Sequence, residues 1–96
     1  MPVRVQITCS LEPSNYPSLK AFLAQNLPNV RGFEGCERVN ILFDETQSQM
    51  LIDEDWQSIN THQNYMMFIS NNGVLETLKA YFSEPPKISY FYLSNL

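Results

Sequence analysis

The chain has 96 residues, of which 44% are hydrophobic and 17% are charged, and its net charge at pH 7 is −4. This composition predicts one globular domain over residues 1–96 rather than a disordered chain. The six basic residues are scattered singly, which argues against a nucleic-acid partner, and no apolar run approaches the ~20 residues of a membrane span. The first ten residues lack a signal-peptide pattern and there are only two cysteines, so we expect a cytoplasmic protein with reduced thiols.

The first half of the chain predicts a strand, a helix and a second strand. "VRVQITCS" alternates between apolar and polar residues, which is typical of a half-buried strand. A helix is expected to begin near Pro17, and Pro28 either ends it or kinks it into one more turn. After the turn "GFEG", the stretch "CERVNILFD" predicts the second strand. The helix carries an apolar stripe formed by Leu19, Phe22, Leu23, Leu27 and Val30.

The second half predicts a hairpin, a helical region and a last strand. "MLIDEDW" is the return strand of the hairpin, with Met50, Ile52, Glu54 and Trp56 on one face. Ser58 is a suitable N-cap for a helix from residue 59 to about residue 70. Gly73 separates this helix from a second apolar helical stripe, and "KISYFYL" predicts the final strand.

The resulting order, β-α-β-β-α-β, is the split-βαβ pattern of an α+β, ferredoxin-like fold. It implies an antiparallel four-stranded sheet with helices on one face only. The other face of the sheet must then meet water or a partner.

A candidate site lies in "DEDWQSINTHQNYMMF", which contains the only Trp and the only His of the chain. His62, Tyr65 and Met66 have helical spacing, so they can face the sheet beside Trp56. Each ring taken singly also has an ordinary packing interpretation. Strand alternation puts Asp53 and Asp55 opposite Glu54, so these acids cannot form one paired site, and we expect them to be solvated or at an interface. One His and no paired thiols offer no metal-ligand spacing.

An ordered set of segments carries a resemblance to a known family: "FEGC", "IDEDW", the serine with "H..Y" on the next helix, and "EPPKISYF". In this order the chain resembles the antibiotic-biosynthesis-monooxygenase, or quinol-monooxygenase-like, family over about residues 3–93. The resemblance implies a homodimeric α+β barrel, in which two sheets pair through their helix-free faces. It also implies a pocket between the sheet and the helices of each chain, where some members oxidise anthrone-like or hydroquinone substrates with O2 and without metal or flavin.

Cofactor-free oxygenation needs a base and a dry wall that holds an aromatic substrate, because the deprotonated substrate itself donates electrons to O2. On this hypothesis the catalytic residues are His62, Trp56 and Tyr65, with His62 as the base or proton shuttle. Tyr65 or Tyr90 would donate a hydrogen bond to an oxygen that gains charge. The expected substrate-binding residues are Phe22, Ile52, Met66 and Tyr90.

Two alternatives remain from the sequence. One is a non-catalytic domain of the same fold that binds a small apolar ligand or only dimerises. The other is haem degradation, a related activity within the resemblance, whose branch has a pocket-facing Asn on the first strand and a His on the second helical region. Ile7 and Met66 stand near these positions, which argues against haem ligation.

Overall fold

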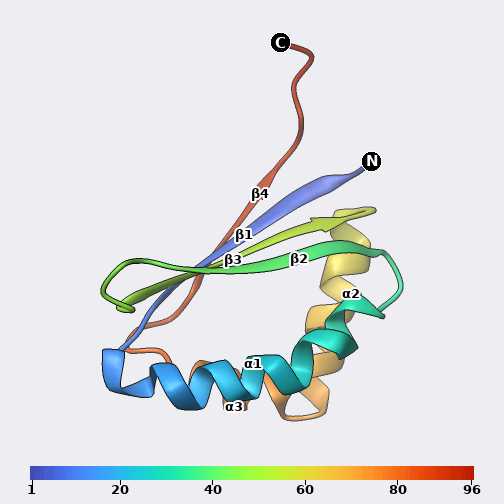
Figure 1. Cartoon of the computed structure of the whole chain (residues 1–96). Helices are drawn as coiled ribbons and strands as arrows, with labels where there is room; N and C mark the ends of the chain where they lie inside the picture. Colours follow the sequence, from blue (N-terminus) through green and yellow to red (C-terminus); the bar gives the residue numbers. More distant parts are fainter.

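A four-stranded antiparallel sheet forms one layer of the computed structural model, which describes residues 1–96, and the helices cover one face of that sheet (Figure 1). The strand order is β2-β3-β1-β4. The strands are β1 (Val3–Ser10), β2 (Cys36–Phe43), β3 (Gln49–Trp56) and β4 (Lys87–Phe91). The helices are η1 (Pro13–Asn15), α1 (Tyr16–Arg31), α2 (Ile59–Asn71) and α3 (Val74–Lys79). The predicted ferredoxin-like order and the one-sided helical layer are therefore confirmed.

Local sequence signals explain where the helices begin and end. Ser58 caps α2 through a capping box, in which its Oγ accepts from Thr61 N at 3.1 Å and Thr61 Oγ1 accepts from Ser58 N at 3.2 Å. Pro28 does not end α1, which continues to Arg31. Gly73 separates α2 from α3 with φ of 87°, a conformation that glycine adopts without strain.

The hydrophobic core lies between the sheet and the helices. β3 is paired with β1 on one side and β2 on the other, so it is central in the sheet. Its covered face carries Met50, Ile52, Glu54 and Trp56, all of them buried. The alternation predicted for β1 places Val3, Val5, Ile7 and Cys9 in the same core. Both cysteines are free thiols, and no helix is long and apolar enough to cross a membrane.

The last strand is shorter than predicted, because β4 ends at Phe91 and the stretch from Tyr92 onward runs away from the sheet (Figure 1). β4 pairs with β1 in a register that sets Arg4 opposite Phe91. If this register continued, it would set Pro2 opposite Leu93, and proline has no N–H to donate to a ladder.

Candidate functional site

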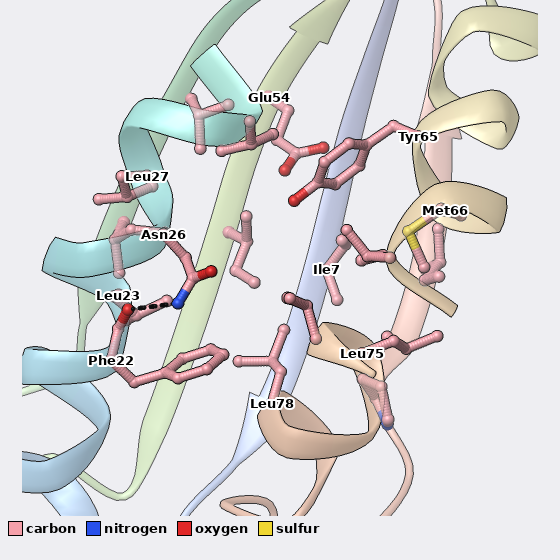
Figure 2. A pocket seen from close by; sticks show the side chains of 18 of the residues that line it. Ile7, Phe22, Leu23, Asn26, Leu27, Glu54, Tyr65, Met66, Leu75 and Leu78 are labelled. Atoms are coloured by element: carbon pink, nitrogen blue, oxygen red, sulfur yellow. Dashed lines mark hydrogen bonds between the residues drawn. The ribbon is translucent and has the colours of Figure 1, made fainter. Parts of the chain in front are cut away.

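A mostly apolar cavity of about 80 Å³ lies between the sheet and the three α-helices (Figure 2). Sixteen of its 19 lining residues are hydrophobic. Its hydrogen-bonding groups are the Glu54 carboxyl, the Tyr65 hydroxyl and the Asn26 amide. An apolar cavity with few polar groups is the usual form of a small-molecule site. The remaining wall includes Ile7, Phe22, Leu23, Ile52, Met66, Leu75 and Leu78.

Glu54 is the only acidic or basic residue on the wall of this cavity. Strand alternation puts it on the covered face of β3 between Ile52 and Trp56, and it is 4% exposed. Trp56, two residues along on the same face, donates from Nε1 to Glu54 Oε1 at 2.9 Å. Burial raises the pKa of Glu54 to about 7, although the Trp56 hydrogen bond favours the ionised form. A carboxyl with such a pKa can accept and release a proton near neutral pH.

His62 lies behind Glu54 and does not line the cavity. It is in the first turn of α2 and is 1% exposed. Its Nε2 is 3.6 Å from Glu54 Oε1, and its Nδ1 is 2.9 Å from the Tyr90 hydroxyl. The pair with Glu54 would be an ion pair only if His62 were protonated, and burial opposes this by lowering the pKa of His62 to about 4. At neutral pH the ring is therefore uncharged.

A cluster of aromatic rings, which includes Trp56 and His62, lies beside Glu54. Trp56 contacts His62 and Tyr65, with ring centroids 5.4 and 5.5 Å apart. Phe33, from the turn before β2, lies 5.2 Å from Tyr65 and 6.3 Å from Trp56 between centroids. Burial, and then the nearby Glu54, raise the pKa of Tyr65 to about 12, so its hydroxyl stays a hydrogen-bond donor.

A close approach of two segments brings these rings together. Gly35 has φ of 90°, and a Cβ atom added there would be 2.4 Å from Thr61 Cβ. Gly35 O also accepts from Gln57 N at 2.8 Å. The turn before β2 therefore packs directly against the first turn of α2, which carries His62.

A shallow groove leads outward from the cavity between α1 and α2. It has a volume of about 400 Å³ and is lined by Phe33 and Phe68. Asn26, Tyr65, Ile69 and Val74 line both the groove and the cavity, so they separate the two spaces.

The predicted site residues fall into two groups. Phe22, Ile52, Tyr65 and Met66 line the cavity. Trp56, His62 and Tyr90 do not line it, and they form a second layer that contacts Glu54 or extends from it.

Two residues that contribute polar groups to the cavity, Glu54 and Asn26, were not predicted as site residues. The expectation that all three acids of "DEDW" are solvated or at an interface is wrong for Glu54, which is buried. Its position between Ile52 and Trp56 was the available signal, because a carboxyl on an apolar strand face is unusual. Asn26 falls in the apolar stripe of α1, where its Nδ2 donates to Phe22 O at 2.9 Å and its amide points into the cavity (Figure 2).

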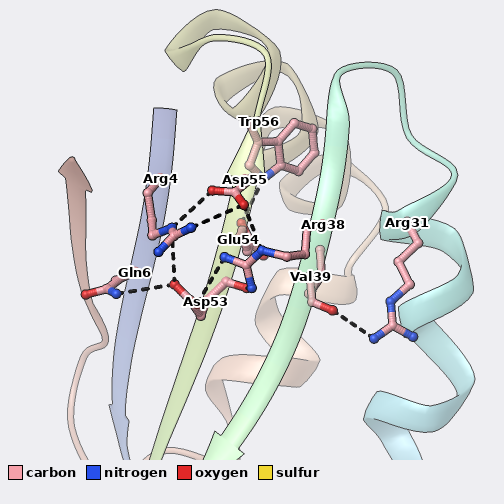
Figure 3. A network of polar contacts seen from close by, with 9 residues as sticks. All are labelled: Arg4, Gln6, Arg31, Arg38, Val39, Asp53, Glu54, Asp55 and Trp56. Carbon is pink, nitrogen blue, oxygen red and sulfur yellow. Dashed lines mark hydrogen bonds and ion pairs between the residues drawn. The ribbon is translucent and has the colours of Figure 1, made fainter. Parts of the chain in front are cut away.

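The opposite face of the sheet holds a separate polar network (Figure 3). Asp55 accepts from Arg38 Nε at 2.7 Å and from Arg4 Nε at 3.1 Å, and Asp53 pairs with Arg38 at 3.0 Å. Asp53 and Asp55 therefore point away from Glu54, as alternation predicts. The chain contains no group of three His, Cys, Asp or Glu side chains that could hold a metal ion.

By sequence, the chain matches no family model and no curated protein. By structure, it is similar to Rv0793 from Mycobacterium tuberculosis, with a TM-score of 0.84 at 14% identity over 100% of this chain and 98% of that one. A proposed antibiotic biosynthesis monooxygenase from Bordetella bronchiseptica has a TM-score of 0.84 at 17% identity, over 97% of each chain. The ActVA-Orf6 monooxygenase of Streptomyces coelicolor, solved with nanaomycin D, has a TM-score of 0.82 at 13% identity, over 98% of this chain and 88% of that one. The fold is thus that of antibiotic biosynthesis monooxygenase structures.

Proposed function

We propose that the chain is a cofactor-independent monooxygenase, which binds a small aromatic or quinol-type substrate in the cavity and oxidises it with O2. The observation that carries this proposal is the buried carboxyl of Glu54 in an otherwise apolar wall. The likeness in fold to monooxygenase structures supports it.

Glu54 takes the role of base in this proposal, in place of His62. It is the titratable group on the cavity wall whose pKa lies near neutral, at about 7. His62 is set behind it, with a pKa of about 4, and the Tyr65 phenol has a pKa of about 12. Trp56 and His62 then act as positioning residues, and Tyr65 donates a hydrogen bond to a substrate oxygen that gains negative charge.

For an anthrone-type substrate the chemistry balances when one methylene group and one molecule of O2 give one ketone and one molecule of water. Glu54 removes one C–H proton, and the resulting carbanion passes one electron to O2. The substrate radical and superoxide then join through a new C–O bond. The O–O bond then breaks as the remaining C–H hydrogen passes as a proton to the departing oxygen and the C–H electron pair forms the C=O bond, which gives the ketone and hydroxide. Glu54 returns its proton to the hydroxide to form water, so the carboxylate is ready for another cycle.

The size of the cavity limits the substrate. A cavity of ~150 Å³ can hold benzene, and ligand pockets usually measure ~300–1,000 Å³. At about 80 Å³ the cavity must therefore widen before an aromatic ring can enter. The adjoining groove of about 400 Å³ offers a place to dock, and movement of Tyr65 or Ile69 would join the two spaces. α3, which contributes to the cavity wall, has no fully buried residue, so it can also shift at low cost.

The small volume also favours one competing function, a non-catalytic domain whose cavity is filled mainly by its own side chains. Under this second hypothesis a hydroquinone or anthrone would bind without O2 uptake, or would not bind at all.

Oxygen uptake with a panel of hydroquinones and anthrones tests the proposal. Glu54→Gln keeps the shape of the side chain and an acceptor for Trp56, and we expect kcat to fall ~10²-fold or more because the base is lost. In the unsubstituted chain, kcat/KM should rise with pH to a plateau, with a midpoint near 7. Glu45→Gln, the same change on the exposed hairpin, is the matched control and should leave turnover unchanged. Uptake that survives Glu54→Gln would exclude the assigned base.

We also propose that a second copy of the chain covers the helix-free face of the sheet. That face exposes Leu42 and Phe91, which are 48% and 52% exposed, beside charges that are already paired within the chain. Covering it would therefore bury apolar area while the charges of Arg4, Arg38, Asp53 and Asp55 stay paired within the chain. Sedimentation at micromolar concentration should give twice the chain mass of 11.1 kDa, and sedimentation as a monomer would contradict the dimer.

A further inference from the structure

We infer that Glu54, His62 and Tyr90 form a proton relay, which leads from the cavity through a neutral imidazole to the exposed edge of the sheet. Its use during turnover rests on the proposed function, but the relay itself can be tested without any substrate. It assigns a role to His62 and Tyr90, which do not line the cavity.

The three groups form an uninterrupted chain of close polar contacts. Glu54 Oε1 lies 3.6 Å from His62 Nε2, and His62 Nδ1 lies 2.9 Å from the Tyr90 hydroxyl. Tyr90 is half-buried on the edge strand β4, near the exposed side chain of Gln63. The line therefore starts at the cavity wall and ends where solvent has access.

The unpaired Nε2 atom of His62 supports a contact between His62 and Glu54. Nε2 is buried and has no hydrogen-bond partner within 3.5 Å, and an unpaired buried polar atom costs ~1–3 kcal/mol. Glu54 Oε1 lies 3.6 Å from this nitrogen, just beyond hydrogen-bond range. A small side-chain movement that closes this gap would satisfy Nε2 in either protonation state of Glu54.

The tautomer of His62 must then follow the proton on Glu54. When Glu54 is a carboxylate, the ring carries its proton on Nε2, which faces the carboxylate, and Nδ1 accepts from the Tyr90 hydroxyl. When Glu54 is protonated, its O–H donates to Nε2 and the ring donates from Nδ1–H to Tyr90. The 2.9 Å contact with Tyr90 serves both states, because a hydroxyl can donate or accept.

Burial, rather than a nearby charge, keeps the ring neutral in both states. Burial lowers the pKa of His62 to about 4, so an imidazolium is unfavourable at neutral pH. Burial also raises the pKa values of the neighbouring thiol and phenols, which keeps them uncharged. From the other face, Asp53 raises the pKa of Glu54 and Arg38 lowers it. The titratable groups that act on Glu54, or on which Glu54 acts, are thus Cys36, Arg38, Asp53, Tyr65 and Tyr90, and Arg31 and Glu37 act in turn on Cys36.

Each transfer moves one proton and leaves no charge behind on the ring. The Glu54 O–H bond breaks as His62 Nε2–H forms, the Nδ1–H proton passes to the Tyr90 oxygen, and the original hydroxyl proton of Tyr90 leaves to water. Glu54 becomes a carboxylate, while His62 and Tyr90 stay neutral. Glu54 can therefore exchange its proton with solvent while an apolar ligand fills the cavity and excludes water from it.

The single Trp and the single His make this testable in one 15N-labelled sample. Trp56 Nε1–H reports the charge on Glu54, to which it is bonded, and the two ring nitrogens of His62 report the tautomer. In a pH titration we expect both reporters to change with one midpoint near 7, with His62 exchanging its protonated nitrogen rather than becoming an imidazolium. A Trp56 transition with an unchanged His62 tautomer would overturn the relay, and so would an imidazolium at that midpoint.

Three variants sharpen the test. Glu54→Gln should abolish both transitions near pH 7. Tyr90→Phe keeps the ring but removes the exit group, so exchange of the Glu54 proton, measured from the broadening of the Trp56 signal, should slow at least several-fold. Tyr92→Phe is the same change beyond β4 and should alter nothing. Unchanged exchange in Tyr90→Phe would exclude Tyr90 from the relay.

The relay and the proposed function fail separately. Coupled transitions of Trp56 and His62 without O2 uptake on any substrate would reject the monooxygenase and keep the relay. Turnover that depends on Glu54, together with a fixed His62 tautomer, would reject the relay and keep the monooxygenase.

Discussion

Three consecutive carboxyl groups on β3 lie in opposite environments on the two faces of one sheet. Asp53 and Asp55 face away from the helices, where Arg4 and Arg38 pair with them (Figure 3). Glu54 faces the cavity, where its partners are the neutral Trp56 and His62. The pKa of Asp55 is lowered by its arginine hydrogen bonds, whereas burial raises the pKa of Glu54 to about 7.

The contrast shows that the sheet face on which a carboxyl group lies, rather than the residue type, decides whether it can exchange a proton near neutral pH. Both arginines that lie on the sheet contact the open face, and neither reaches Glu54 with a hydrogen bond. A carboxyl paired with arginine is held ionised and is a poor base, while an isolated buried carboxyl can exchange a proton near pH 7.

The largest expected effect is on the pH dependence of the free energy of unfolding. In the unsubstituted chain the contributions of Glu54 and His62 to this dependence nearly cancel. The pKa of Glu54 rises from 4.5 to about 7 on folding, so its contribution to stability falls as the pH rises through this range. The pKa of His62 falls from 6.5 to about 4, so its contribution rises over nearly the same range. The two slopes oppose each other between about pH 4.5 and 6.5.

Glu54→Gln should expose the slope of His62. Its free energy of unfolding, from urea denaturation, should rise by about 3 kcal/mol between pH 4 and 6.5, while the unsubstituted chain stays nearly flat from pH 4.5 to 6.5. His62→Gln should show the reverse, a fall of about 3 kcal/mol between pH 4.5 and 7. Glu45→Gln should keep the profile of the unsubstituted chain. Identical profiles for Glu54→Gln and the unsubstituted chain would mean that Glu54 is not desolvated.

A second, smaller effect should follow from removing the one hydrogen bond that Glu54 receives. Trp56→Phe should destabilise the chain by about 1 kcal/mol more at pH 8 than in a Glu54→Gln background. In the unsubstituted chain it removes a hydrogen bond to a charged group, worth ~1.5–3 kcal/mol, whereas the amide in the Glu54→Gln background accepts only a neutral hydrogen bond, worth ~0.5–1.5 kcal/mol. It should also raise the pKa of Glu54 further, since Trp56 favours the ionised form. The double-mutant cycle, followed by urea unfolding, separates this term from the loss of aromatic packing. A coupling energy near zero would show that Trp56 only packs against Glu54.

The sequence predicted the fold because its signals are local. Alternation in "VRVQITCS" and "MLIDEDW", the Ser58 cap and the turn glycines each specify one element, and their order specifies the topology. Alternation also placed Glu54 with Ile52 and Trp56. The end of β4 was missed, because it depends on the partner strand beginning beside Pro2.

The site was only partly predictable. Helical spacing shows which residues share a face of the helix, but it does not show which of them reach the cavity. His62 and Tyr65 are three residues apart and share a face, as predicted. Tyr65 reaches the cavity, whereas His62 points behind Glu54 toward Tyr90. The placement of α2 against the sheet involves the packing of Gly35 against Thr61, a contact between residues 26 positions apart that no periodicity encodes.

The smallest expected effect concerns the open face. Arg38→Met removes the hydrogen bonds to Asp53 and Asp55 but keeps a long apolar stem, and partly exposed ion pairs contribute only ~0.2–1 kcal/mol. In the dissociated chain, where this face is open to water, the free energy of unfolding should therefore fall by ~1 kcal/mol or less at low salt, and by less still in 1 M NaCl, because salt screens exposed charges. The pKa of Asp55, followed by 13C NMR of its carboxyl, should move back toward its ordinary value. A loss of several kcal/mol in the dissociated chain that salt does not reduce would show that water is excluded from this network even without a partner. The carboxyl groups on the two faces of β3 would then differ in whether an arginine pairs with them, and not in their exposure to water.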